Sequence, residues 1–122
     1  GRWIAFNQSD TGLVLQPDSA LYLVPAAGGK ARRMRCNTGR MNSWHCWSPN
    51  GRWLVFASKA VTPYTELLIT HVDENGNDSP PVALNRLNRE GFAAVLPEVI
   101  PSAGNNPRKI RIGTGFLGGP SP

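Results

Sequence analysis

Two stretches of the sequence share one short motif. Residues 47–58 read WSPNGRWLVFAS, and residues 1–6 read GRWIAF. Aligning Gly1 with Gly51 gives a period of 50 residues, and both copies place tryptophan, aliphatic residues and phenylalanine in one short run. Runs of this length and composition favour a β-strand. The sequence therefore predicts one β-rich unit that occurs twice.

The remainder of each copy predicts further short strands and tight turns. A second apolar run is followed by a turn dipeptide, and a third run closes the copy. Both dipeptides supply the positive φ angles that a hairpin turn needs. In the first copy the two runs are 20–25 and 30–35, with Gly28-Gly29 between them. In the second copy they are 67–72 and 80–85, with Asn75-Gly76 between them.

A fourth segment recurs between the copies and after the second one. Residues 41–51 read MNSWHCWSPNG, and residues 91–100 read GFAAVLPEVI. Each is expected to hold a short strand that ends near a proline, Pro49 or Pro97, because proline halts strand pairing. Four short antiparallel strands in about 50 residues are typical of a β-propeller blade.

The composition agrees with an all-β domain. The 122 residues include 13 glycines and 11 prolines, which favour short strands joined by turns over long helices. Hydrophobic residues make up 40% of the chain, as in a globular protein. No stretch approaches the ~20 apolar residues of a membrane span.

The quoted residues also carry a family resemblance. WSPNGRWLVFAS followed by ELLITHVDENG resembles the WD40-like β-propeller repeat of the TolB family, with Asn50 where the family usually has aspartate. The first copy resembles the repeat from Gly1 to about Asn37, and residues 69–84 resemble the last blades of TolB-like proteins. The resemblance implies an all-β fold of two four-stranded antiparallel blades in an incomplete ring.

This reading divides the chain into four parts and predicts a piece of a larger assembly. The first blade is expected to lack its innermost strand. The tail is either a linker or an arm whose run Lys109–Phe116 adds a strand to a partner. The parts are a partial blade at 1–40, a blade at 41–90, the start of a further blade or a closing strand at 91–100, and a Gly/Pro-rich basic tail at 101–122.

Aromatic and basic residues supply the candidates for the core and for binding. The repeat predicts that Trp3, Phe6, Trp53 and Phe56 form the blade cores. The net charge is +5, and the basic residues cluster in two places. They either form a partner-binding patch or lie on the solvent face of a strand, and no nucleic-acid motif accompanies them. The candidates for partner binding are Lys30, Arg32, Arg33, Arg35, Arg108, Lys109 and Arg111.

Two short motifs suggest chemistry and are better explained as loops. Asp10-Thr11-Gly12 is the triplet of aspartic proteases, but polar residues precede it instead of an apolar strand. The run DENGND at 73–78 could suggest calcium, yet it lacks the spacing of an EF-hand loop, and a turn explains the same residues. We therefore predict no metal and no cofactor.

The two cysteines allow a disulfide more readily than a metal site. Cys36 and Cys46 could pair in an oxidising compartment. Together with His45 and His71 they lack the paired spacing of a zinc site, and no haem-attachment motif occurs.

The resemblance implies a non-catalytic β-propeller module for protein–protein interaction or scaffolding in the bacterial cell envelope, either periplasmic or extracellular. Its partners would be other protein chains or missing propeller blades, and neither nucleic acid nor a transmembrane segment is expected. The sequence shows no nucleophile–base constellation and no Gly-x-Ser-x-Gly elbow, so we expect no enzyme in this chain. Two alternatives stay open: the propeller domain of a larger prolyl-oligopeptidase-like peptidase, and an accessory subunit of a membrane or redox complex.

Overall fold

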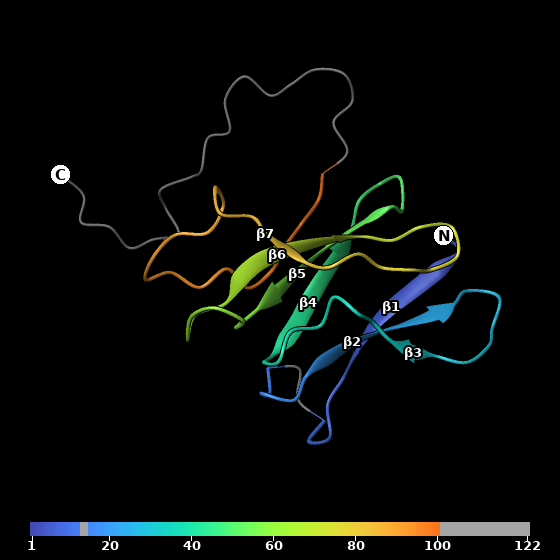
Figure 1. Ribbon diagram of the computed structural model, residues 1–122, viewed down its shortest axis with the longest axis horizontal. Helices are drawn as coiled ribbons and strands as arrows, with labels where there is room; N and C mark the ends of the chain where they lie inside the picture. The colour runs from blue at the N-terminus through green and yellow to red at the C-terminus, as the bar shows by residue number, and fades with distance from the viewer. Residues whose placement is uncertain (13–14, 101–122) are drawn as a thin grey trace, which may run out of the picture.

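The computed structural model describes residues 1–12 and 15–100, and these residues form two antiparallel sheets without a helix (Figure 1). The first sheet has three strands in the order β1-β2-β3, and the second has four in the order β4-β5-β6-β7. Their bounds are β1 Trp3–Gln8, β2 Ala20–Pro25, β3 Arg32–Arg33, β4 Asn42–Trp47, β5 Trp53–Ser58, β6 Glu66–His71 and β7 Val82–Ala83.

The all-β prediction is confirmed, and the two sheets form no closed ring within the described residues. The strand register matches in the two units once the second strand is placed one residue earlier than the sequence alignment put it, since β6 begins at Glu66 and not at Leu67. Trp3 lies opposite Pro25, as Trp53 lies opposite His71, and both pairings continue in step along the strands. The third strands, expected at 30–35 and 80–85, are only two residues long.

Two asparagines brace equivalent points of the two sheets. The Asn37 side chain accepts a hydrogen bond from the Leu21 amide at 2.7 Å and donates one to the Leu21 carbonyl at 2.8 Å. The Asn88 side chain makes the same two bonds with Leu67, at 2.7 and 3.1 Å. Each amide side chain therefore acts as a further ladder partner beyond a two-residue strand.

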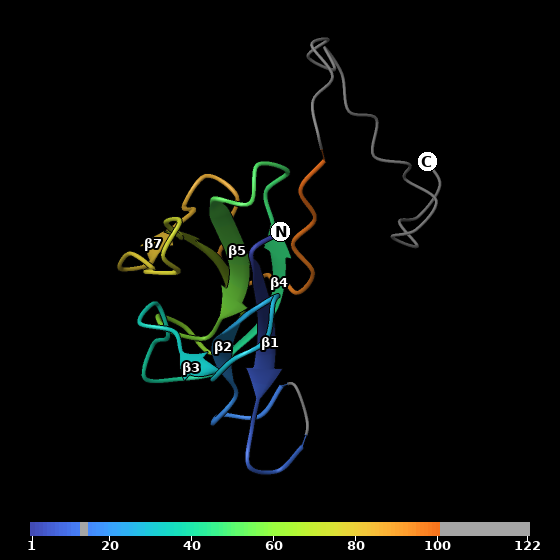
Figure 2. The same cartoon turned by 90° about the vertical axis from the view of Figure 1, so that its right-hand side faces the viewer.

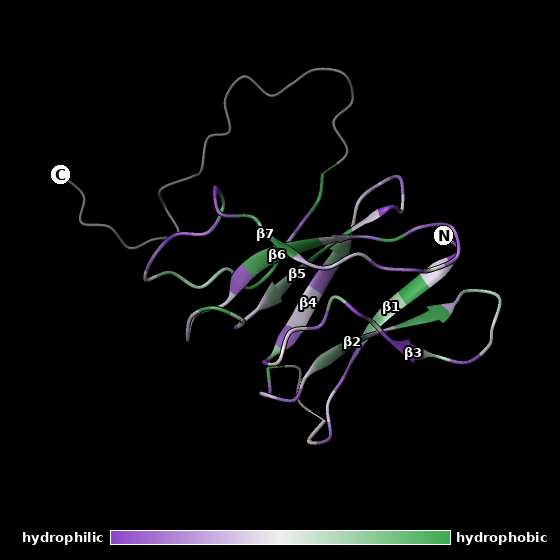
Figure 3. Ribbon diagram, viewed as in Figure 1, coloured by the Kyte–Doolittle hydropathy of each residue, from purple (hydrophilic) through white to green (hydrophobic). Residues whose placement is uncertain are grey.

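The core lies between the two sheets, which Figure 2 shows one above the other. Apolar residues dominate β1, β2 and β6, whereas β3 is polar (Figure 3). The first sheet contributes Leu21 and Leu23 of β2, and the second contributes Leu54 and Phe56 of β5; all four are fully buried. The complete cluster is Ala5, Leu21, Leu23, Met34, Cys36, Leu54, Phe56, Leu68 and Val72, with Trp3 and Trp47 packed against it.

Only part of the predicted aromatic core is buried. Phe56 is fully buried and Trp3 packs against the core. Trp53, however, is 43% exposed and meets His71 edge-on, while Phe6 is half-buried and stacks on Tyr22 with ring centroids 5.7 Å apart. Alternate residues of a strand face opposite sides. The sheet that buries Phe56 therefore turns Trp53 outward.

The turn after β6 ties the second sheet to the first. The Asp78 side chain is fully buried, pairs with Arg32 at 3.0 Å and accepts the Cys36 amide at 2.6 Å. Gly76, at φ 79°, lies so close to Trp3 that a Cβ there would come within 2.6 Å of the ring. One turn therefore fixes both the third strand of the first sheet and the tryptophan of its first strand.

The segment after β7 has no regular secondary structure at residues 92–100. The Ala94 amide donates to the Thr65 carbonyl at 2.8 Å. The expectation that 91–100 begins a further blade or closes a ring stays a prediction, and the tail at 101–122 lies outside the described residues. Across the part of the chain that the structure describes, no helix is long and apolar enough to cross a membrane.

Candidate functional site: a tryptophan-lined cleft

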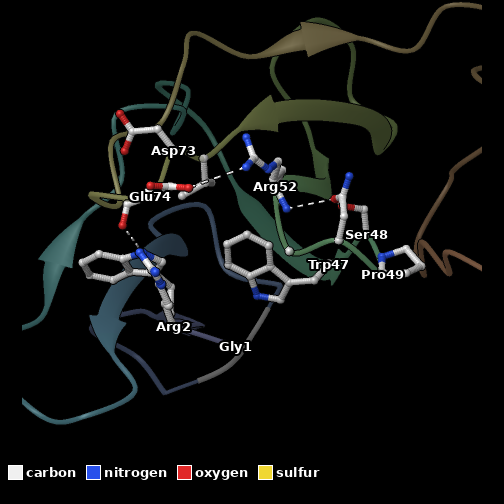
Figure 4. A pocket seen from close by; sticks show the side chains of 12 residues that line it. Gly1, Arg2, Trp47, Ser48, Pro49, Arg52, Asp73 and Glu74 are labelled. Carbon is white, nitrogen blue, oxygen red and sulfur yellow. Dashed lines mark hydrogen bonds and ion pairs between the residues drawn. The ribbon is translucent and has the colours of Figure 1, made fainter.

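A cleft of about 470 Å³ opens at one end of the two sheets (Figure 4). The start of β1 forms one wall, and the β4–β5 loop and the residues after β6 form the others. Figure 4 shows the Trp47 ring within the cleft, with Arg52 on one side and Arg2 and Glu74 on another. The lining residues are Gly1, Arg2, Trp3, Trp47, Ser48, Pro49, Asn50, Gly51, Arg52, Val72, Asp73 and Glu74.

The β4–β5 loop is held rigidly by its own hydrogen bonds. The Ser48 amide donates to the Trp53 carbonyl at 2.8 Å, and the Trp53 amide returns a bond to Ser48 Oγ at 3.0 Å. The Asn50 side chain accepts the Arg52 amide at 3.1 Å, so asparagine serves this turn as an acceptor. Gly51 adopts φ 66°, a conformation that glycine takes without strain. This loop therefore holds Arg52 in a defined place at the rim.

The turn on the opposite rim is closed by Asp73. Its carboxylate accepts the amides of Asn75 and Asn77 at 2.9 and 2.8 Å, and the Asn77 side chain at 3.1 Å. These bonds from Asn77 lower the pKa of Asp73. The carboxylate is engaged by donors of its own turn, which confirms the turn expected for DENGND. The described residues hold no cluster of histidine, cysteine and acidic groups that could bind a metal.

Two contacts connect the rims across the cleft. Trp3 Nε1 donates to the Glu74 carbonyl at 3.3 Å, and Arg52 Nη2 lies 3.6 Å from Glu74 Oε1. The Arg52 and Glu74 side chains are 58% and 70% exposed. An exposed pair of this kind contributes about 0–1 kcal/mol, so either group can exchange its partner for a ligand at low cost.

The cleft combines flat apolar walls with charged groups at the rim. Indole rings offer large contact areas that stack on apolar or planar groups, and guanidinium groups form charge-assisted hydrogen bonds with carboxylates and carbonyls. Among the described residues that line it, none is histidine or cysteine. The arrangement suits binding of an extended chain.

The basic residues predicted from the first cluster lie elsewhere. Lys30, Arg33 and Arg35 are exposed around β3 and do not line the cleft. Arg32 was expected to bind a partner, but it is bonded to buried Asp78 and helps to join the two sheets. The Arg32 side chain therefore has a structural contact, and its role in partner binding stays a prediction. Arg108, Lys109 and Arg111 lie outside the described residues.

Both cysteines are free in the structure, so the disulfide that the sequence allowed is not formed there. Cys36 is buried next to Asp78, and burial followed by the Asp78 charge raises the pKa of its thiol to about 12. Cys46 lies on β4, where its Sγ accepts the Val99 amide at 3.4 Å. The two thiols lie in different environments, Cys36 in the turn after β3 and Cys46 on β4.

His45 joins β4 to β1. Its Nε2 lies 3.0 Å from the Ala5 carbonyl and its Nδ1 lies 3.0 Å from Asn7 Oδ1. A bulge between Ser43 and His45, with the intervening Trp44 at φ 34°, aims the ring at β1. Burial lowers the pKa of His45, against the smaller opposing effect of the Ala5 carbonyl.

Sequence reasoning missed the cleft and the buried pair of Asp78 with Arg32. Asp78 was expected only as part of a turn, and its partner lies 46 residues away. Trp47 was quoted in the repeat but not proposed as a site residue. The signal that could have found it is its position directly before the Ser-Pro-Asn-Gly turn, at the end of a strand.

No protein family, curated protein or solved structure matches the chain.

Proposed function

We propose that this chain is a non-catalytic β-propeller module that binds or scaffolds other proteins in the bacterial cell envelope. The 50-residue repeat, its matching strand register and the stacking of its two sheets support the propeller-blade assignment. The envelope location rests on the resemblance to TolB-like repeats alone. In this proposal the chain contributes two blades to a larger assembly.

One observation carries the binding function: the cleft where Trp3, Trp47, Arg52 and Glu74 meet. Tryptophan and arginine dominate the energetics of protein–protein contacts, particularly where they meet in a pocket. We propose that an extended segment of a partner protein lies in this cleft. Its apolar side chains stack on the indole rings, and its backbone carbonyls or acidic groups bind the guanidinium groups.

The test uses the 122-residue chain and a displayed library of random peptides. Peptides selected on the immobilised chain are titrated into ¹⁵N-labelled protein, and the indole N–H signals of Trp3 and Trp47 are followed by NMR. The cleft is altered by Arg52→Glu, whose side chain is 58% exposed. The matched control is Arg86→Glu, which reverses the charge of an exposed arginine outside the cleft.

The proposal expects that bound peptides shift both indole signals. Arg52→Glu is expected to weaken binding about tenfold or more, which corresponds to 1.4 kcal/mol. Arg86→Glu is expected to leave it unchanged. Peptides that bind without moving either indole signal, or equally well to both variants, would show that the cleft is not the binding site. A library that yields no binder also contradicts the proposal.

A further inference from the structure

Each sheet has an outer face that the other sheet does not cover. On the first sheet this face carries Ile4 and Phe6 of β1 with Tyr22 and Val24 of β2; Ile4 is 52% exposed and the other three are half-buried. We call this surface face A. Its centre is apolar, and exposed Arg33 of β3, which pairs with Tyr22, lies at its edge.

The outer face of the second sheet also carries apolar residues, with His71 beside Trp53. Trp53 and Val55 of β5 lie beside Ile69 of β6, and Val82 of β7 pairs with Ile69. Trp53 is 43% exposed and Val82 is 62% exposed. We call this surface face B.

The repeat shows how faces A and B are related. Ala5 of β1 is buried between the sheets, whereas its counterpart in the repeat, Val55, lies on face B. In the opposite sense, Phe56 is buried between the sheets and its counterpart Phe6 lies on face A. The same exchange holds in the second strands, where Leu23 is buried and Ile69 is not.

The existing contact between the sheets is therefore heterologous. One sheet uses one face, and its repeat partner uses the opposite face. Face A is the repeat counterpart of the buried face of the second sheet, and face B is the counterpart of the buried face of the first. A contact between two different surfaces can be continued at both ends, giving a ring or an open stack.

We infer that face A of one copy of this chain packs against face B of a second copy, and so repeats the contact already made within the chain. The second copy is the occupant because the interface is continuous with an established one. The second copy also carries both matching surfaces, because its face B fits face A of the first copy and its face A fits face B. The inference concerns the sheet faces and does not depend on ligand binding in the cleft.

The segment after β7 covers the β4 side of face B, where Cys46 lies opposite Val55, and leaves Trp53 and Val82 exposed. The Val99 amide reaches Cys46 Sγ on the β4 side, while Trp53 and Val82 keep the exposures given above. The segment adds exposed apolar side chains of its own, including Val95 at 39% and Leu96 at 71%. These side chains extend the apolar surface that a second copy would bury.

The test separates the two faces by placing a charge on each. Ile4→Lys alters face A, and Val82→Lys alters face B. Val61→Lys is the matched control, because Val61 is 71% exposed in the loop after β5 and lies on neither strand face. Circular dichroism and cooperative unfolding establish that each variant is folded. If a lysine variant does not fold, Phe6→Ser replaces Ile4→Lys on face A and Trp53→Ser replaces Val82→Lys on face B. Sedimentation velocity over a range of concentrations measures association.

The wild type and Val61→Lys are expected to associate as concentration rises. Ile4→Lys alone and Val82→Lys alone are each expected to self-associate at least about tenfold more weakly than the wild type. An equimolar mixture of the two restores a 1:1 dimer, because one variant keeps face B and the other keeps face A. A wild type that stays monomeric overturns the inference, as does a variant that self-associates as well as the wild type. Peptide binding in the cleft is measured separately, so the failure of one proposal is distinguishable from that of the other.

Discussion

Replacing Asp78 by alanine should cost more stability than replacing any other acidic residue of the same turn. The Asp78 carboxylate is fully buried, bonds Arg32 at 3.0 Å and accepts the Cys36 amide at 2.6 Å. Removing one partner of a buried ion pair costs about 3–5 kcal/mol because the other charge is left unpaired. The Arg32 side chain is 37% exposed and keeps some water, so the expected loss is near the lower limit, about 3 kcal/mol.

The loss is measured as the free energy of unfolding in urea, with Glu74→Ala as the matched control. Glu74 lies in the same turn and also faces an arginine, but both side chains of that pair are largely exposed. Its removal is expected to cost about 0–1 kcal/mol. With an unfolding entropy of about 2.1 cal/mol/K per residue, a loss of about 3 kcal/mol in Asp78→Ala corresponds to a fall of roughly 12 °C in Tm. Asp78→Ala and Glu74→Ala that agree within about 0.5 kcal/mol would refute the reasoning.

Three further outcomes follow from the described geometry. Gly76→Ala should destabilise the protein more than Gly51→Ala in urea unfolding. Both glycines have positive φ, but a Cβ at residue 76 would lie 2.6 Å from the Trp3 ring, whereas a Cβ at residue 51 would meet open space. Equal losses of stability would contradict this. At pH 8 a thiol reagent should modify Cys46 in the folded protein, whereas Cys36, with its pKa near 12, should react only on unfolding; rapid labelling of both would argue against the burial of Cys36. Burial lowers the pKa of His45 below 6.5, so on acidification the unfolded chain binds the proton before the folded one does. The free energy of unfolding should therefore fall as pH decreases through 6.5. His45→Gln should flatten this pH dependence, and an unchanged slope would exclude His45 as its source.

The strands of each unit were predictable from local patterns. The run at 20–25 coincides with β2, and the tryptophan-containing run of the second copy forms β5. Both are short apolar segments bounded by turn residues, a signal that is complete within a few positions. The third strands are shorter than expected, since Asn37 and Asn88 replace their further ladder bonds with side-chain bonds.

The buried faces could not be predicted in the same way. β5 is apolar on both sides, so the alternation that distinguishes a buried face from a solvated one is missing. The repeat itself misleads here, because it suggests that Trp3 and Trp53 are equivalent inside the fold. They are equivalent in register, but the sheets stack through opposite faces, so only Trp3 packs against the core.

The cleft and the buried ion pair arise from contacts between distant parts of the chain. Trp3 and Trp47 come together only because the two sheets stack. Asp78 and Arg32 likewise meet across 46 residues. No local pattern fixes such distances, whereas the Ser-Pro-Asn-Gly turn at one rim was evident from four consecutive residues.

The central claim is that two repeat units stack through opposite faces, and methyl–aromatic cross-peaks in an NMR spectrum test it most directly. With leucine and isoleucine methyl groups and phenylalanine and tyrosine rings labelled, the account predicts cross-peaks between the Phe56 ring and the methyl groups of Leu21 or Leu23, which share its buried cluster. It predicts none between Phe56 and the face A residues Ile4 and Tyr22. Cross-peaks from Phe56 to face A, with none to the β2 leucines, would contradict the account.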